Sequence, residues 1–181
     1  MSRPELRPGN GRPRAGIFGC AGLELSAEEA GFFKQVDPLG FILFRRNIEE
    51  PAQVRRLVAA LRACVGRDDA PILIDQEGGR VARIGPPHWP SFPSGAEIAR
   101  RWRQAPEVAV ETAWRAGRLI AEELHALGID VDCAPVLDVP APDGHDIIGD
   151  RAYGAGPEPV IALGGAFARG LLDGGVLPVI K

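Results

Sequence analysis

Cysteine is scarce in this chain of 181 residues, and the cysteines present form no recognisable pattern. Cys20, Cys64 and Cys133 are odd in number and widely spaced, with no C-x-x-C pair. This spacing predicts neither a disulfide framework nor a zinc site. It is typical of a protein in a reducing compartment, so we expect a cytoplasmic location.

Long hydrophobic runs and an excess of one charge sign are also missing. The apolar stretches fall well short of the roughly 20 residues that cross a bilayer. The apolar stretch before Cys20 is also too short for a signal peptide, although several arginines precede it. Lys and Arg total 21 against 24 Asp and Glu, for a net charge of −3, and no basic stripe is present. We therefore expect neither a membrane nor nucleic acid as a partner.

What is present is an alternation of short apolar runs and helical patterns. Residues 1–14 carry Pro, Gly and Arg with little to bury, and we expect them to be a disordered lead-in. The apolar runs are short, are bounded by Gly, Pro or Asp, and are apolar on both faces, which predicts strands of a buried parallel sheet. They lie at 16–21, 40–44, 71–75, 129–136 and 177–181.

A helical pattern occupies each connection between these runs. Val54, Leu57, Val58 and Leu61 recur at helical spacing and predict an amphipathic helix over 51–65. A second helix is expected over 105–127, with Trp114 on its apolar side. Ser26 and Glu29 form a capping-box pattern for a helix ending near residue 36, and a last helix is expected over 157–172.

The order of these elements predicts an α/β fold with right-handed crossovers. Polar residues recur at the C-terminal ends of the strands, among them Asp75, Asp138 and Lys181. Active sites of (β/α)8 barrels are assembled at that face, which favours a barrel over a doubly wound sheet. The sequence has no G-x-G-x-x-G after a strand and no P-loop, so no nucleotide cofactor is expected. A complete barrel needs about 250 residues. Residues 15–181 therefore predict the first five strands of a TIM barrel, incomplete in this chain.

Three motifs carry a resemblance to a known family. They are ILIDQEGGRVAR at 72–83, APVLDV at 134–139 and IGDRAYG at 148–154, supported by GFILFRRN at 40–47. In this order and spacing, the chain resembles the family-3 glycoside hydrolases, specifically the bacterial β-N-acetylglucosaminidases (β-N-acetylhexosaminidases) of peptidoglycan recycling. The resemblance implies an exo-acting retaining hydrolase that removes terminal β-linked N-acetylglucosamine from muropeptide-derived saccharides. We expect no cofactor and no metal.

The resemblance also implies which residues contact the sugar. Asp75, Arg83, Arg151 and Lys181 match the family's substrate-binding positions. Their chemistry is suitable, because a carboxylate accepts sugar O–H donors while Arg and Lys donate charge-assisted hydrogen bonds. The alternative for Asp75 and Arg83 is an ion pair without a ligand, and for Arg151 it is a pair with Asp150.

The catalytic groups are expected elsewhere. In the family, a histidine acid/base follows the lysine that matches Lys181, and an aspartate nucleophile comes from a later strand. We therefore expect both after Lys181, no catalytic residue within residues 1–181, and no hydrolysis by this segment alone. The alternatives are a family-3 β-glucosidase, or a non-catalytic sugar-binding half-barrel if the chain ends at residue 181.

Other residues could be mistaken for the catalytic groups. We interpret His88, His125 and His145 as surface residues, and the D-G-H-D cluster at 143–146 as a turn rather than a metal site. Asp130 and Asp132 alternate onto one face of a strand, and at least one should be hydrogen-bonded, because an unpaired buried carboxylate is costly. Of the tryptophans, we expect Trp114 in the core and only Trp89 within reach of a ligand.

Overall fold

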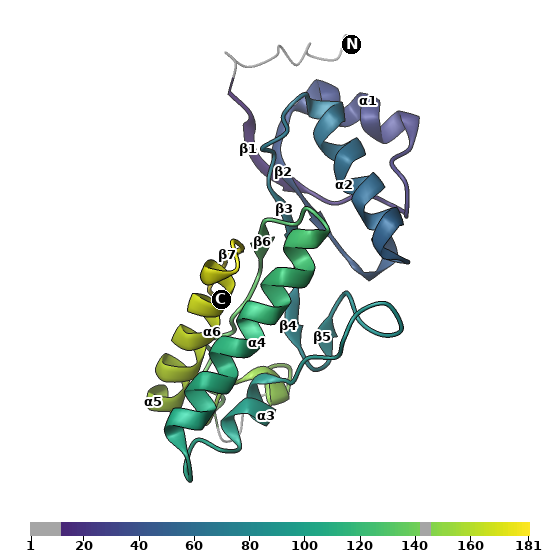
Figure 1. The fold of residues 1–181 in the computed structure, drawn as a ribbon. Helices are drawn as coiled ribbons and strands as arrows, with labels where there is room; N and C mark the ends of the chain where they lie inside the picture. The colour runs from purple at the N-terminus through teal and green to yellow at the C-terminus, as the bar shows by residue number, and fades with distance from the viewer. Residues whose placement is uncertain (1–11, 142–145) are drawn as a thin grey trace. The chain divides into compact units, whose positions relative to one another are not determined.

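The computed structural model describes residues 12–141 and 146–181. The chain divides into two compact units. The first ends at Leu73, and the second begins at Ile74. Most of the expected lead-in, and His145, lie outside the described residues. Figure 1 shows the fold of each unit as a ribbon.

The first unit is a β-α-β-α segment. Strand β1 (Arg14–Phe18) pairs in parallel with β2 (Pro38–Leu43), and helix α1 (Ala27–Val36) connects them. The predicted capping box forms, since Ser26 and the Glu29 side chain each accept a hydrogen bond from the other's backbone N–H. A short 3₁₀ turn, η1 (Arg45–Asn47), leads into helix α2 (Pro51–Val65), which occupies the predicted residues.

Apolar side chains from these elements form the core of the first unit. Helices α1 and α2 pack against each other (Figure 1). The predicted stripe of α2 is buried, with Val54 and Leu61 fully inaccessible, and Phe33 of α1 packs edge-on against Phe41 of β2. The amphipathic pattern therefore predicted the inward face correctly.

The second unit carries the remaining strands. The boundary between the units falls within strand β3 (Ile72–Ile74), and in the second unit β6 (Val131–Asp132) pairs in parallel with β7 (Leu177–Pro178). The strand order is β1-β2-β3-β6-β7. A separate antiparallel hairpin, β4 (Gln76–Gly78) and β5 (Val81–Ala82), follows β3 directly.

Helices fill the connections of the second unit. Helix α3 (Gly95–Ala99) and the long α4 (Pro106–Ala126) precede β6. A 3₁₀ turn, η2 (Gly149–Arg151), then leads to a helical stretch composed of α5 (Pro157–Pro159), the π-helical turn η3 (Val160–Gly164) and α6 (Gly165–Asp173). Helices α4 and α6 run side by side (Figure 1), and Gly117 and Gly170 each lie against backbone of the other helix, leaving no room for a Cβ atom.

These observations confirm the predicted α/β class, with a sheet of five strands and a helix in every connection between them. The sheet is open over the described residues rather than closed into a barrel. In the two outermost strands of this sheet, Ile17 of β1 and Leu177 of β7 are exposed. The hairpin β4–β5 and helix α3 were not predicted.

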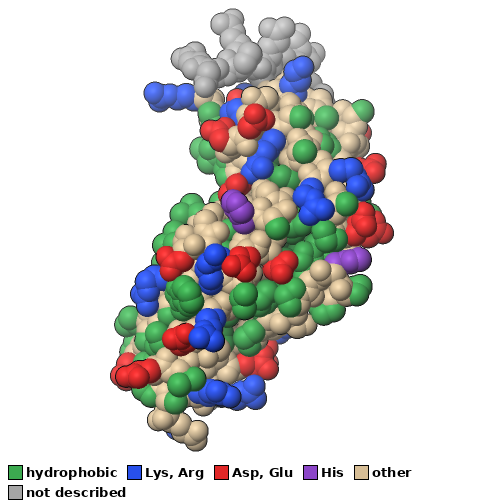
Figure 2. Space-filling model, in the orientation of Figure 1, with side chains coloured by type: hydrophobic (Ala, Val, Ile, Leu, Met, Phe, Trp, Pro, Cys, Tyr) green, Lys and Arg blue, Asp and Glu red, His purple; other side chains and the backbone are tan. Residues whose placement is uncertain are grey.

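Two further features concern the distribution of charge on the surface and the length and polarity of the helices. Figure 2 shows basic and acidic side chains interspersed on the face in view, with no area of one sign. No helix within the described ranges is long and apolar enough to cross a membrane.

The turn after β4 generates the first testable prediction. Gly78 has φ +91°, and a Cβ atom there would overlap the carbonyl oxygen of Pro93. We expect Gly78→Ala to lower the free energy of unfolding by roughly 2–4 kcal/mol, from backbone strain and steric overlap together. Urea unfolding of the full-length protein measures the effect. Gly85→Ala is the control, because Gly85 has open space around its Cβ position and should change little. Equal effects of the two substitutions would contradict this account of the turn.

Candidate functional site

The site begins with two carboxylates on one extended stretch. Asp75 follows β3 and Glu77 lies in β4, so the alternation of side chains places both on the same side of the chain. Gln76, between them, is buried and faces the opposite side. Its side-chain oxygen accepts hydrogen bonds from the backbone N–H groups of Arg83 (2.8 Å) and Ile84 (3.1 Å). The Gln76 side chain therefore holds the two strands of the hairpin β4–β5 together at its start.

Three cations reach these carboxylates and form an alternating chain of charges. Arg83 Nη2 lies 3.0 Å from Asp75 Oδ2, and Lys181 Nζ lies 2.8 Å from both Asp75 Oδ1 and Glu77 Oε1. Arg151 binds Glu77 through two contacts, Nε to Oε2 and Nη2 to Oε1, each 2.8 Å. We call Arg83, Asp75, Lys181, Glu77 and Arg151 the charge chain. All five belong to the second unit.

The structure thus brings the four predicted sugar-binding residues together and adds Glu77, which the sequence analysis missed. A signal was available, because Glu77 is two residues from Asp75 within the same motif and would lie on the same side of an extended chain. The alternative pairing of Arg151 with Asp150 is wrong. Arg151 pairs with Glu77, while Asp150 pairs with Arg80 at 2.7 Å.

Burial and ion pairing act against each other on these groups. The side chains of Asp75 and Glu77 are only 17% and 7% exposed. Burial alone would raise the pKa of Asp75, but hydrogen bonds and attraction from Lys181 and Arg83 outweigh it and hold the pKa below its usual value. Burial would likewise lower the pKa of Lys181, but its contacts with Asp75 and Glu77 raise it. Asp75 is therefore a stable anion and a poor proton donor near neutrality.

Arg80 anchors the segment that presents Arg151. Its guanidinium donates to Asp150 Oδ1 and to the backbone carbonyl oxygens of Ile147 (2.6 Å) and Ile148 (3.1 Å). The 3₁₀ turn η2, which ends at Arg151, begins directly after these carbonyls. The D-Q-E-G-G-R motif therefore holds the I-G-D-R motif at two points, through Glu77 and through Arg80.

The buried carboxyl group of Asp132 holds the backbone between Asp75 and Glu77 in place. It is fully buried in β6, and its Oδ1 accepts the backbone N–H of Gln76 at 2.9 Å. Its Oδ2 has no hydrogen-bond partner among the described residues. Burial raises the pKa of Asp132 well above its usual value. The expectation that Asp130 or Asp132 is hydrogen-bonded is thus confirmed by Asp132, while Asp130 is half-exposed.

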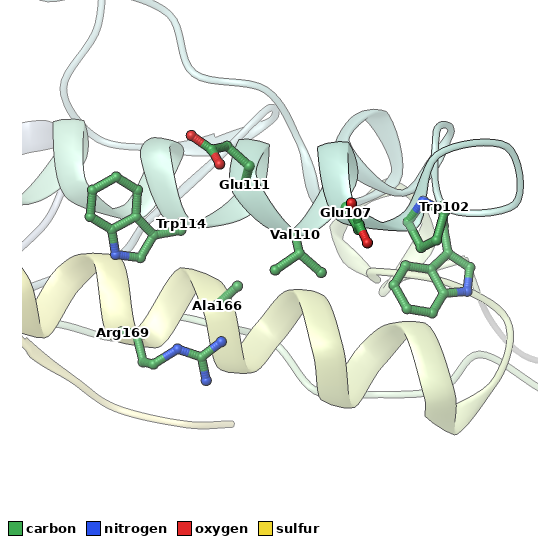
Figure 3. Close-up of a pocket in the computed structure, with 8 residues that line it drawn as sticks. Trp102, Glu107, Val110, Glu111, Trp114, Ala166 and Arg169 are labelled. Carbon is green, nitrogen blue, oxygen red and sulfur yellow. The ribbon is translucent and has the colours of Figure 1, made fainter.

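The aromatic predictions need correction. Trp89 is buried, only 6% exposed, and its ring packs edge-on against His88, so it presents little surface to a ligand. Trp114 is not in the core but half-buried, and its indole Nε1 donates to Asp173 at 2.7 Å. Figure 3 shows Trp114 and Trp102 beside a groove of about 430 Å³ along α4 and α6. None of the residues that line this groove belongs to the charge chain.

The remaining candidates are histidines and possible metal ligands. His88 and His125 are exposed, as predicted, and the cluster at 143–146 lies largely outside the described residues. Within the parts of the chain that the structure describes, no group of three or more His, Cys, Asp or Glu side chains could hold a metal ion.

Comparison with known proteins identifies the family. Residues 18–181 match the glycosyl hydrolase family 3 N-terminal domain. Beta-hexosaminidases of Pseudomonas aeruginosa and Xanthomonas oryzae pv. oryzae are 39% identical over 160 residues and 36% identical over 167 residues, covering 88% and 91% of this chain. The chain therefore belongs to glycosyl hydrolase family 3. It spans about half the length of these relatives, 46% and 48%.

Solved structures agree with this assignment. Native NagZ from Neisseria gonorrhoeae is similar over 93% of this chain and 49% of its own, with a TM-score of 0.86 and 32% identity. A second structure of the same protein, with equal TM-score and identity, is in complex with N-trifluoroacetyl-D-glucosamine.

The anchoring role of Arg80 can be tested by hydrogen exchange. The backbone N–H groups of Arg151 and Ala152 donate to the carbonyls of Ile148 and Gly149 within the anchored segment. We expect Arg80→Ala to speed exchange of these two amides by roughly tenfold or more, because the segment loses its shared donor. The control is Arg115→Ala, which breaks an exposed pair with Glu111 on α4. Unchanged protection at both amides would show that Arg80 does not anchor the segment.

The buried carboxyl of Asp132 predicts a pH-dependent stability. Its native pKa is raised, so the folded state keeps a proton that the unfolded state loses above about pH 4. The contribution of Asp132 to stability is therefore present at low pH and lost as pH rises. Asn cannot titrate, so we expect Asp132→Asn to become increasingly stable relative to the parent protein from pH 4 to pH 8. Urea unfolding across this range measures the difference, and one that is flat or shrinks with pH would contradict the assignment.

Proposed function

We propose that the full-length protein is an exo-acting retaining β-N-acetylglucosaminidase that removes terminal β-linked N-acetylglucosamine from peptidoglycan-derived saccharides. The observation that carries the proposal is the charge chain. It gathers Asp75, Arg83, Arg151 and Lys181, the four residues that the family resemblance assigns to sugar binding, from three separate segments of the chain.

The chemistry of the charge chain is suited to a sugar. Asp75 offers a fixed anionic acceptor for sugar O–H groups, while Arg83, Arg151 and Lys181 offer cationic donors around it. Because the pKa of Asp75 is held below its usual value, we assign it to binding rather than to proton transfer. The acid/base histidine and the nucleophilic aspartate are proposed in the part of the full-length protein after Lys181.

The relatives favour an N-acetylated sugar over glucose. Two of them are named beta-hexosaminidase, and the solved relative from Neisseria gonorrhoeae binds an N-acylated glucosamine. A cytoplasmic location, in which the substrates are recycled muropeptide saccharides, is part of the same proposal. It is supported by the cysteine pattern of the sequence.

Replacement of Asp75 tests the proposal. We expect the full-length protein to cleave a chromogenic β-N-acetylglucosaminide and to prefer it strongly over the matching β-glucoside. Asp75→Ala should lower kcat/KM about 100-fold or more, because sugar hydroxyls, Arg83 and Lys181 all lose a charged partner.

Each alternative has its own outcome in this experiment. A preference for the β-glucoside would favour the β-glucosidase reading. Binding of N-acetylglucosamine without turnover of either substrate would favour a non-catalytic sugar-binding protein. Activity that is unchanged in Asp75→Ala would remove the charge chain from the site.

A further inference from the structure

Glu77 differs from the other members of the charge chain in how its atoms are used. Its side chain is the least exposed, at 7%, against 17% for Asp75, 19% for Arg151 and 32% for Lys181. Its two oxygens accept three contacts, two from Arg151 and one from Lys181, each 2.8 Å. A carboxylate has about four acceptor positions, so little of Glu77 remains for a substrate.

We propose that Glu77 is a positioning residue for sugar binding, which sets the places of Arg151 and Lys181 without itself touching the sugar. This inference rests on the proposed function. It assigns a role to a residue that the family resemblance left without one.

The two cations depend on Glu77 to different degrees. Apart from Glu77, the Arg151 side chain has a contact of 3.4 Å with the carbonyl oxygen of Ile147. Lys181, by contrast, keeps Asp75 at 2.8 Å if Glu77 is lost. We therefore expect the removal of Glu77 to displace Arg151 more than Lys181.

Glu77 can position other groups because its own backbone is fixed on both sides. The backbone N–H of the preceding Gln76 donates a hydrogen bond to Oδ1 of buried Asp132, at 2.9 Å. On the following side, Gly78 adopts φ +91° against Pro93, and the next amide, of Gly79, donates to Phe92 O at 2.9 Å. The carboxylate thus projects from a rigid turn, which is what a fixed reference point for two longer, flexible cationic side chains requires.

The first test is Glu77→Gln in the full-length protein, with kcat/KM measured on a chromogenic β-N-acetylglucosaminide. Gln has nearly the same shape, but it places an amide N–H₂ against a guanidinium that needs an acceptor. We expect a loss of about 10- to 100-fold. The matched control is Glu111→Gln, the same chemical change in an exposed pair on α4, which should stay within about twofold of the parent.

A double-mutant comparison separates positioning from direct contact with the sugar. If Glu77 acts mainly through Arg151, its loss should matter little once Arg151 is gone. We expect Arg151→Gln and the double variant Glu77→Gln/Arg151→Gln to agree within a few-fold. This comparison also stands if Glu77→Gln alone does not fold, because the double variant leaves no unpaired charge between these two residues.

The ammonium group of Lys181 gives a readout that does not depend on activity. Contacts with Asp75 and Glu77 raise its pKa against the opposing effect of burial. Replacing Glu77 with Gln should therefore lower that pKa, as measured by NMR titration of the lysine side chain. The Glu111→Gln control should leave it unchanged.

The outcomes separate this inference from the proposed function. If the parent protein does not cleave the N-acetylglucosaminide, the proposed function fails. If the parent is active and Glu77→Gln retains its full kcat/KM, the positioning role fails alone. A large further loss on adding Glu77→Gln to Arg151→Gln, or an unchanged pKa of Lys181, would also overturn it.

Discussion

The second unit depends on two carboxylates that lie two residues apart on one extended stretch and are both largely buried. Asp75 and Glu77 lie on the same side of an extended chain, so their charges would repel each other if no cations lay between them. Lys181 lies between them, and Arg83 and Arg151 lie at the outer ends. These cations come from the end of the hairpin, from the turn η2 and from the residues after β7. Compensating these two charges therefore brings the turn η2 and the residues after β7, both distant in the sequence, to the hairpin.

The residues of the D-Q-E-G-G-R motif act together to build this arrangement of charges. The side chain of Gln76 points away from the charge chain and accepts hydrogen bonds within the hairpin, while its backbone N–H donates to buried Asp132. The glycine turn that follows lets the backbone pass against Pro93. Arg80 then fastens the segment that carries Arg151. Each position has a separate physical task, which explains why the motif needs these residue types in this order.

How much of this could be predicted from the sequence differs between elements and partners. Helix α2 occupied its predicted residues because its apolar spacing, an initial Pro51 and a closing Gly66 with φ 64° all act locally. The partners of Glu77 could not be found in this way, since Arg151 lies 74 residues away in the sequence and periodicity carries no information at that range. Trp114 was misplaced for a related reason. Its helical spacing matched the apolar stripe, but its indole N–H needs a partner, which Asp173 provides at the surface.

The central claim is that the charge chain is a sugar-binding site in which Glu77 positions the contacting residues and does not itself touch the sugar. The most direct measurement is a crystal structure of the full-length protein with bound N-acetylglucosamine. The account predicts sugar hydroxyls within hydrogen-bond distance of Asp75 and of at least one of Arg83, Arg151 and Lys181, with Glu77 still paired to Arg151 and not touching the sugar. A sugar bound away from Asp75, for example on Trp102 and Trp114 in the groove along α4 and α6, would contradict it.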